Sequence, residues 1–471
     1  MPKRREMLEE IFTSIPDKIR GAAIAKAKIH SQMANLLRIL GDIPRGLEEG
    51  KKAVKLLKGR SSKKCKLLLS ASYKALGSVY ISKGNIQAAF EAFTQAYRIG
   101  VLAQDLKGQC YSLNNIGAVL KFQGELNKSE RVFQKSMKIA RAIGDRRMWA
   151  TIHSNLGAVY NGMERFDDAL VNFNKCVDIS NEIGNLKGLQ AAYMNMGISY
   201  NFMKVQNRAE ESYTKSIEIS EALNYPAGVA KGNINLGLLY KNMNELGKAR
   251  KALSEALEIC EKVSDERSKG IALNNLGLIY LKECDHTNAE KCFFRYLENA
   301  EKVSDKNGIC VAHEDLGELY LDTEDLEKAI FNLKAAEELS RQNGPRRRLA
   351  KTLFRLGYLL NDEQRFQEGV KILDETKAPD TELEYLRFLG AFQFKHGKTT
   401  EGIRTLRKGI KTADKFPEHI ELKICLLFEL TRNLKKSGDH NKEFIAAKKQ
   451  LISESKKAGL DAAASYYKDF L

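Results

Sequence analysis

The residues with the most reactive side chains are scattered along the sequence instead of forming a familiar catalytic or metal-binding pattern. Cys284, His286 and Cys292 lie within nine residues of one another, but a zinc site needs four ligands and usually contains a closely spaced cysteine pair. His153 and His313 stand where equivalent segments carry tyrosine or leucine, so we expect packed histidines instead of catalytic bases. The sequence contains no phosphate-binding loop, nucleophile elbow or zinc-protease motif. We therefore predict no enzyme activity, no metal and no cofactor.

A run of basic residues near the N-terminus is the strongest charge signal. It contains no acid across sixteen residues, and its members are Lys51, Lys52, Lys55, Lys58, Arg60, Lys63, Lys64 and Lys66. Residues 1–69 carry 17 basic and seven acidic side chains, within a chain of net charge +17. Such a run can neutralise phosphates, so docking on nucleic acid or an anionic surface is one hypothesis. It lacks aromatic residues for base stacking, which favours a solvated helix end and linker.

The cysteines and the hydropathy bear on the compartment. Eight cysteines without paired spacing indicate reduced thiols in a chain of 471 residues. No apolar run reaches the roughly eighteen residues that a transmembrane helix needs. We expect a cytoplasmic protein with no transmembrane segment.

A glycine recurs at every fortieth residue. The eight members of this series are Gly77, Gly117, Gly157, Gly197, Gly237, Gly277, Gly317 and Gly357. Leucine, isoleucine or methionine stands one residue earlier, and tyrosine or leucine stands three residues later. A small residue follows twelve positions after the glycine and an aromatic residue or leucine sixteen after. Spacings of one, three and four place these residues on helical faces, so each unit is predicted to be a helix–turn–helix hairpin.

The repeat glycines need a physical reason, because glycine inside a helix costs about 1 kcal/mol relative to alanine. We interpret them as points where two helices approach too closely for a side chain, with the small residue twelve positions later as the facing surface. The pattern breaks around Gly84, Gly124, Asn244 and Glu324, which predicts the tight turns of the hairpins.

This combination of leucine, glycine, tyrosine, small residue and aromatic residue resembles the tetratricopeptide repeat, in a long form with a forty-residue period. The resemblance implies an all-α fold, an α-solenoid that winds as a right-handed superhelix of about 10–11 repeats with the first helix of each repeat lining a concave groove. We divide the chain into an N-terminal helical cap (1–26), a divergent first repeat with a basic linker (27–69), eight regular units (70–378), two divergent C-terminal repeats (379–457) and a C-terminal tail or cap (458–471).

The helical stripe next to the glycines predicts what the groove displays. Its candidate peptide-binding residues are a ladder of asparagines, an apolar floor and a group of acids: Asn115, Asn155, Asn195, Asn235 and Asn275; Met194, Ile198, Phe202, Ile234, Leu238 and Leu278; Glu314, Glu318 and Asp322. Asparagine amides both donate and accept hydrogen bonds, which suits an extended peptide backbone. The same asparagines could instead bind neighbouring helices, and the acids could lie on a solvated helix.

These observations favour a non-catalytic scaffold or adaptor that binds a peptide or helix of a protein partner in the groove. The ligand would have apolar anchors and a basic end beside the acids. Two alternatives stay open: a basic solenoid that docks on nucleic acid or an anionic surface, and a regulatory or sensor subunit of a separately encoded signalling enzyme. Self-association through the terminal repeats is also compatible with the sequence.

Overall fold

The computed structural model describes residues 7, 22–437 and 441–470, and this part of the chain consists of α-helices, one short 3-10 helix and their turns. In chain order the α-helices are α2 Ala22–Ile39, α3 Ile43–Leu57, α4 Lys63–Ser82, α5 Ile86–Leu102, α6 Leu106–Phe122, α7 Leu126–Ala142, α8 Arg146–Gly162, α9 Phe166–Glu182, α10 Leu186–Phe202, α11 Gln206–Ala222, α12 Pro226–Asn242, α13 Leu246–Val263, α14 Glu266–Lys282, α15 His286–Lys302, α16 Lys306–Asp322, α17 Leu326–Asn343, α18 Arg346–Leu360, α19 Glu363–Thr376, α20 Pro379–Lys395, α21 Thr399–Ala413, α22 Ile420–Ser437, α23 Asn441–Lys457 and α24 Asp461–Phe470.

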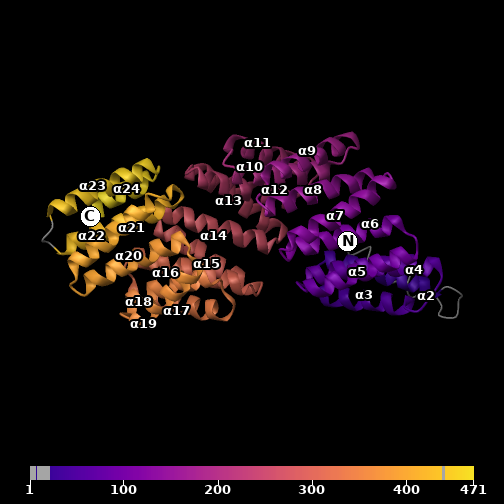
Figure 1. Cartoon of the computed structure of the whole chain (residues 1–471), viewed down its shortest axis with the longest axis horizontal. Coiled ribbons are helices and arrows are strands. Elements are labelled where there is room, and N and C mark those ends of the chain that lie inside the picture. The colour runs from indigo at the N-terminus through magenta and orange to yellow at the C-terminus, as the bar shows by residue number, and fades with distance from the viewer. Residues whose placement is uncertain (1–6, 8–21, 438–440, 471) are drawn as a thin grey trace. The chain divides into compact units, whose positions relative to one another are not determined.

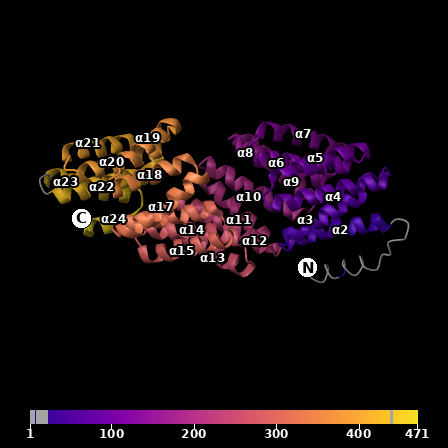
Figure 2. The ribbon, with the colours of Figure 1, turned by 90° about the horizontal axis from the view of Figure 1, so that it is seen from below.

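The helices pair in chain order into hairpins, from α2 with α3 to α22 with α23, and α24 packs on α23. We call the even-numbered partners the first helices and the odd-numbered partners the second helices. The chain divides into unit 1, Met1–Asn224, and unit 2, Tyr225–Leu471. Figures 1 and 2 show the hairpins following one another within each unit. The prediction of an all-α solenoid of helix hairpins is therefore confirmed.

The predicted boundaries can be compared with these helices. Most of the predicted N-terminal cap, residues 1–26, lies outside the described residues, and α2 runs across its boundary at residue 26. The predicted basic linker is largely helical, because α3 continues to Leu57 and α4 begins at Lys63.

A residue with left-handed backbone conformation stands at the turn of each regular hairpin up to α17. Gly84 and Gly124 adopt φ of +79° and +78°, and Glu164, Lys204 and Asn244 adopt nearly the same conformation forty residues apart. Left-handed backbone costs roughly 1–2 kcal/mol for a residue with a Cβ. Turns are thus confirmed at the predicted positions, and the repeat geometry imposes them even where glycine is absent.

The repeat glycines lie against the large side chain sixteen positions later. A Cβ on Gly157 would lie 2.5 Å from the ring of Phe173, and one on Gly117 would lie 2.8 Å from that of Phe133. The small residue twelve positions later lies beside the glycine backbone, as when Ser129 Oγ donates to the carbonyl oxygen of Gly117 at 2.7 Å. The predicted close approach is confirmed, but the group that fills the space is the ring and not the small residue.

The last regular unit changes its packing. A Cβ on Gly357 would lie 2.8 Å from the ring of Phe366, only nine positions later. Leu373, which the repeat pattern places in this role, is half-buried beside the same core. The shorter α19, which ends at Thr376, accompanies this change.

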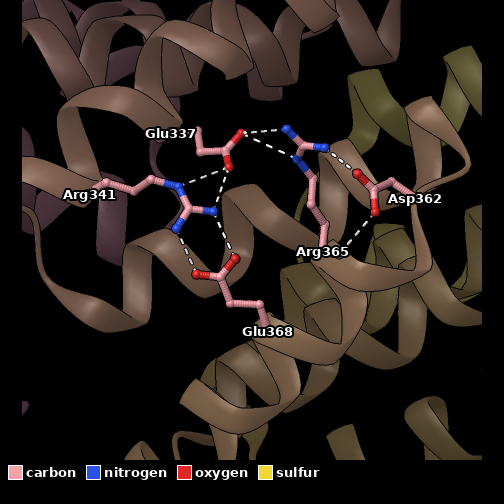
Figure 3. Close-up of polar contacts among 5 residues, drawn as sticks. All are labelled: Glu337, Arg341, Asp362, Arg365 and Glu368. Carbon is pink, nitrogen blue, oxygen red and sulfur yellow. Dashed lines mark hydrogen bonds and ion pairs between the residues drawn. The ribbon is translucent and has the colours of Figure 1, made fainter.

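A network of five charged residues joins α19 to α17 (Figure 3). Arg341 donates to Glu337 at 2.8 Å and to the two carboxylate oxygens of Glu368 at 2.7 and 2.8 Å. Arg365 donates from Nε to Glu337 at 3.3 Å and also pairs with Asp362. Glu337 is only 7% exposed, so its two arginine partners are what stabilise its charge in the core.

Candidate functional site

One side of the first helices is defined by the positions two before and one, four and five after each repeat glycine, which share a helical face. We call this surface the first-helix face. In unit 2 it lines a cavity of about 440 Å³, to which it contributes Lys241, Asn242, Leu278, Leu281, Lys282, Asp315, Glu318 and Asp322. The structure therefore brings three of the predicted groove residues, Leu278, Glu318 and Asp322, into one cavity.

The chain's own C-terminal helices form the opposite wall of this cavity. Phe428 on α22 and Leu460, Tyr466 and Tyr467 from the α24 region line it. The ring of Tyr466 meets His286 edge-on, with 6.1 Å between ring centroids. In unit 2 the first-helix face is thus covered by helices of the same chain, which the sequence patterns did not reveal.

Polar contacts hold these C-terminal helices in place. Lys282 on α14 pairs with Glu421 on α22, and Arg432 pairs at 2.5 Å with Glu324 in the turn after α16. The turn before α24 approaches the turn after α12 so closely that a Cβ on Gly459 would overlap the side chain of Asn244.

Two of the three predicted acids, Glu314 and Glu318, meet arginines of the chain itself. Glu314 lies 3.2 Å from Arg348 Nε. Glu318 pairs with Arg355 and lies 3.5 Å from Arg387. Burial opposes ionisation of Glu318, but the two arginine charges outweigh it and lower the pKa of this carboxyl group. The basic groups expected from a ligand are therefore supplied at Glu314 and Glu318 by α18 and α20.

Asp322 is different, because no hydrogen bond or ion pair joins it to another described residue. Burial, together with the neighbouring Glu318, raises its pKa to about 7. Burial also raises the pKa of Asp315 to about 7, although Asn274 donates a hydrogen bond to it. The cavity wall thus holds two carboxyl groups that titrate near neutral pH.

The asparagine ladder is used unevenly. Asn155 donates to Asn114 on the preceding first helix at 2.9 Å. Asn275 accepts from Lys241 at 2.8 Å and donates to the backbone of its own helix. Asn115 and Asn195 make no side-chain hydrogen bond to another described residue and are half-buried. Asn235 is half-buried. At least two amides of the ladder, those of Asn155 and Asn275, therefore bind helices of the chain itself. This is the alternative to peptide binding that the sequence left open.

The predicted apolar residues also differ in exposure. Ile234 is 6% exposed in the unit 2 core, and Leu238 packs at the edge of the same cluster. Met194 and Ile198 are half-buried. Phe202 is 64% exposed and stacks on Phe166 with 5.6 Å between ring centroids.

Sequence reasoning missed Phe122, which is 73% exposed at the end of α6. It stands five positions after Gly117, as Phe202 stands five positions after Gly197. The shared register is the signal that could have identified it. In unit 1 the first-helix face thus exposes two large aromatic side chains.

The basic run lies at the end of α3, in the following turn and at the start of α4. All of its members except the half-buried Lys66 are exposed. Lys52 pairs with Glu48 at 2.7 Å and Glu49 at 3.1 Å, and Arg60 Nε donates to the Leu56 carbonyl oxygen at 2.9 Å.

A second, smaller basic cluster at residues 346–348 is paired within the protein. Arg346 binds Glu375, Arg347 binds Asp380 and Arg348 binds Glu314.

The histidines and cysteines take structural positions. His153 is buried with Nδ1 2.9 Å from Asn172, and burial lowers its pKa. His313 meets Asn332 in the same way at 2.9 Å. The eight cysteines form no disulfide. In the described ranges no group of three or more histidine, cysteine or acidic side chains has the arrangement of a metal site.

The described helices are all too short or too polar to cross a lipid bilayer. Consecutive helix hairpins that share one register define a helical-repeat protein. A tetratricopeptide repeat model matches residues 109–182, 148–222, 228–302 and 268–342, and a second matches residues 71–99. Because these matches cover more than half of the chain, the protein belongs to the tetratricopeptide repeat family.

Solved structures share this fold at low sequence identity. The apo form of RapI is 15% identical, with a TM-score of 0.50 over 72% of this chain and 94% of its own. Aspartyl phosphate phosphatase F from Bacillus subtilis is 15% identical, with a TM-score of 0.50 over 75% and 94%. BtubC from P. vanneervenii is 21% identical, with a TM-score of 0.41 over 47% and 92%. No curated protein sequence matches significantly. The likeness to the first two is one of fold.

Proposed function

We propose that this protein is a non-catalytic scaffold that binds a segment of a partner protein on the first-helix face of unit 1. The observation that carries the proposal is the occupied face of unit 2. There, Leu278 and its neighbours line one wall of a cavity whose other wall is α22 and α24. Repeats of the same register in unit 1 expose Phe122 and Phe202 instead. A surface built to receive a helix in one unit is a suitable receptor for a partner segment in the other.

The energy of this interaction would come from apolar anchors. Large exposed aromatic side chains are frequent sources of binding energy once a partner removes them from water. Met194 and Ile198, half-buried beside Phe202, would form the floor of the same contact. The side-chain amides of Asn115 and Asn195 would then hydrogen-bond the backbone of the segment.

The distances between helices set the length of the segment. Packed helices lie about 8–10 Å apart, and an extended chain advances about 3.3 Å per residue. An extended segment would therefore meet a new first helix at about every third residue. Crossing the four helices α4, α6, α8 and α10 would take about ten residues.

The test is affinity capture with three forms of the full chain. Phe122→Ala combined with Phe202→Ala removes both anchors from exposed positions, so the fold should not be disturbed. Phe331→Ala is the matched control, because this phenylalanine is 69% exposed on the second helix α17. Each recovered partner is then titrated against the three forms by calorimetry.

We expect the double variant to lose at least tenfold in affinity for a direct partner, while the control binds as the unmodified chain does. Circular dichroism must show equal helix content in all three forms. Partners that bind the double variant and the unmodified chain with equal affinity would contradict the proposal.

The exposed basic run supports a second candidate, docking on an anionic surface through residues 51–66. Seven of its eight side chains are exposed at one end of α3 and α4. Such binding would fall steeply between about 50 and 200 mM salt. Replacing Lys55, Lys58 and Lys63 by glutamine should weaken it, whereas the Phe122 and Phe202 substitutions should leave it unchanged.

The absence of disulfides among the eight cysteines supports a reducing compartment. We therefore place the proposed interaction in the cytoplasm. Blocking of the thiols by an alkylating reagent in freshly lysed cells, before any exposure to oxidants, tests this assignment. Recovery of the cysteines in disulfide form would contradict it.

A further inference from the structure

The first helices of unit 1 contain no acidic residue. The described helices α2, α4, α6, α8 and α10 carry twelve lysines and arginines and neither aspartate nor glutamate. The chain average, 60 acids in 471 residues, would place about eleven in these five helices. The five second helices α3, α5, α7, α9 and α11 carry twelve acids and 13 basic residues. Charge is therefore sorted between the two layers of unit 1.

Helix stability does not account for this sorting. The first turn of a helix favours acidic side chains, because the backbone dipole is positive there. The first turns of α4, α6, α8 and α10 nevertheless contain no acid. Asp105 and Asp145 stand just outside α6 and α8, where each accepts a hydrogen bond from a helix backbone N–H.

The repeat architecture does not require it either. The first helix α16 of unit 2 has the same register and carries four acids, Glu314, Asp315, Glu318 and Asp322. Two of these acids pair with arginines of α18 and α20, as described above. For Glu314 and Glu318, the chain itself therefore provides the complementary charge.

Two lysines place positive charge on this side of unit 1. Lys121 stands four positions after its repeat glycine, half-buried next to the exposed Phe122. Burial lowers its pKa, and no hydrogen bond or ion pair joins it to another described residue. Lys74 on α4 is also half-buried, with its ammonium group 5.9 Å from the centroid of the Tyr111 ring. Bringing an anion to such ammonium groups replaces the water lost by burial.

We propose that the first-helix face of unit 1 binds an acidic protein segment, with carboxylates beside Lys74 and Lys121 and apolar side chains against Phe122 and Phe202. This inference rests on the proposed function and adds the charge of the partner. The proposal applies to unit 1 only, because in unit 2 the acid-rich α16 already meets basic groups of its own chain. Nucleic acid is the competing anionic ligand. Half-buried lysines and asparagine amides that can bind a peptide backbone favour the carboxylates of a protein segment over the exposed phosphates of nucleic acid.

The probes are three sets of fluorescein-labelled peptides of about ten residues, the length that spans the face. Each peptide carries two phenylalanines at varied spacing, with glutamate, glutamine or lysine at the remaining positions. Fluorescence anisotropy measures their binding to the full chain at about 50 and 200 mM salt. A single-stranded oligonucleotide of similar length is the fourth probe.

The glutamate peptides should bind at least tenfold more tightly than the glutamine peptides, and the lysine peptides should bind most weakly. Lys74→Gln combined with Lys121→Gln should reduce the affinity for glutamate peptides about tenfold, as expected for two partly buried charge pairs. The matched control is Lys135→Gln with Lys138→Gln, two exposed lysines on the second helix α7. It removes the same charge and should change the affinity less than twofold.

Three results would overturn the inference: equal binding of glutamate and glutamine peptides, equal losses in the two lysine variants, or preference for the oligonucleotide. If glutamine peptides bind as well and lose affinity in the Phe122 and Phe202 variant, the proposed function stands and only the acidic character is refuted. If no peptide of any set binds, both are refuted. Thermal unfolding of each variant at an unchanged midpoint excludes loss of fold as the cause.

Discussion

Replacing Asp322 by asparagine should stabilise unit 2 at pH 8. The pKa of this carboxyl group is raised from 3.8 to about 7, and each unit corresponds to about 1.4 kcal/mol. The full shift would correspond to about 4 kcal/mol. Asp322 is half-buried, so solvent and the nearby arginines reduce this value, and we expect a gain of about 1–2 kcal/mol.

The pH dependence follows from the direction of the shift. The folded protein binds a proton at Asp322 as the pH falls through about 7, whereas the unfolded chain binds it only near the ordinary value of 3.8. Between these values the folded state holds more protons, so the free energy of unfolding increases as the pH falls. The advantage of Asp322→Asn should therefore shrink between pH 8 and pH 5.

Hydrogen exchange measures the change in stability within unit 2, where Asp322 lies. Amides of α16 and α24 report opening of unit 2, while fluorescence of the single tryptophan, Trp149, reports unit 1. Glu327→Gln is the control, because it removes an exposed carboxylate on α17. The reasoning is refuted if Asp322→Asn leaves exchange in α16 and α24 unchanged at pH 8, or if its advantage is the same at pH 5.

Three further substitutions test the packing. Gly157→Ala should lower the free energy of unfolding by about 1–3 kcal/mol, because the new Cβ would overlap the ring of Phe173. Gly247 has open space around it, so the control Gly247→Ala should be neutral or stabilising by up to about 1 kcal/mol. Urea titration compares the two variants. Glu337→Ala should lower the free energy of unfolding by about 1–3 kcal/mol, because Arg341 and Arg365 lose a buried partner. A melting temperature equal to that of the unmodified chain would contradict this. Lys204→Gly should raise the free energy of unfolding by about 0.5–1 kcal/mol, because it removes a Cβ from a residue with left-handed backbone. Calorimetric unfolding detects the change.

The hairpins and their turns could be predicted because they depend on contacts within one repeat. Glycine at a fixed position requires a close neighbour, and that neighbour lies only sixteen residues away in the same hairpin. The error over which residue fills the space had a physical cause. Small and aromatic residues share the same helical face, and only the side-chain direction distinguishes them.

The surroundings of the acids could not be predicted in this way. Glu318 meets Arg387, 69 residues later, and Lys282 meets Glu421, 139 residues later. No local pattern encodes such distant pairs. For the same reason, the sequence could not predict that α22 and α24 cover the first-helix face of unit 2. The absence of acids from the described first helices of unit 1 can be read in the sequence, but it becomes informative only when the helix boundaries separate the two layers.

The long stretch of chain between α24 and the helices that it covers has a consequence during synthesis. The helices α12, α14 and α16, which form the first-helix face of unit 2, precede α24 by more than 130 residues. At about 5–20 residues per second, a ribosome needs on the order of ten seconds or more for that stretch. Throughout this interval the nascent chain has a receptor surface without its cover. A partner present at the ribosome could therefore reach this face before α24 is made, and α24 would then have to compete with it.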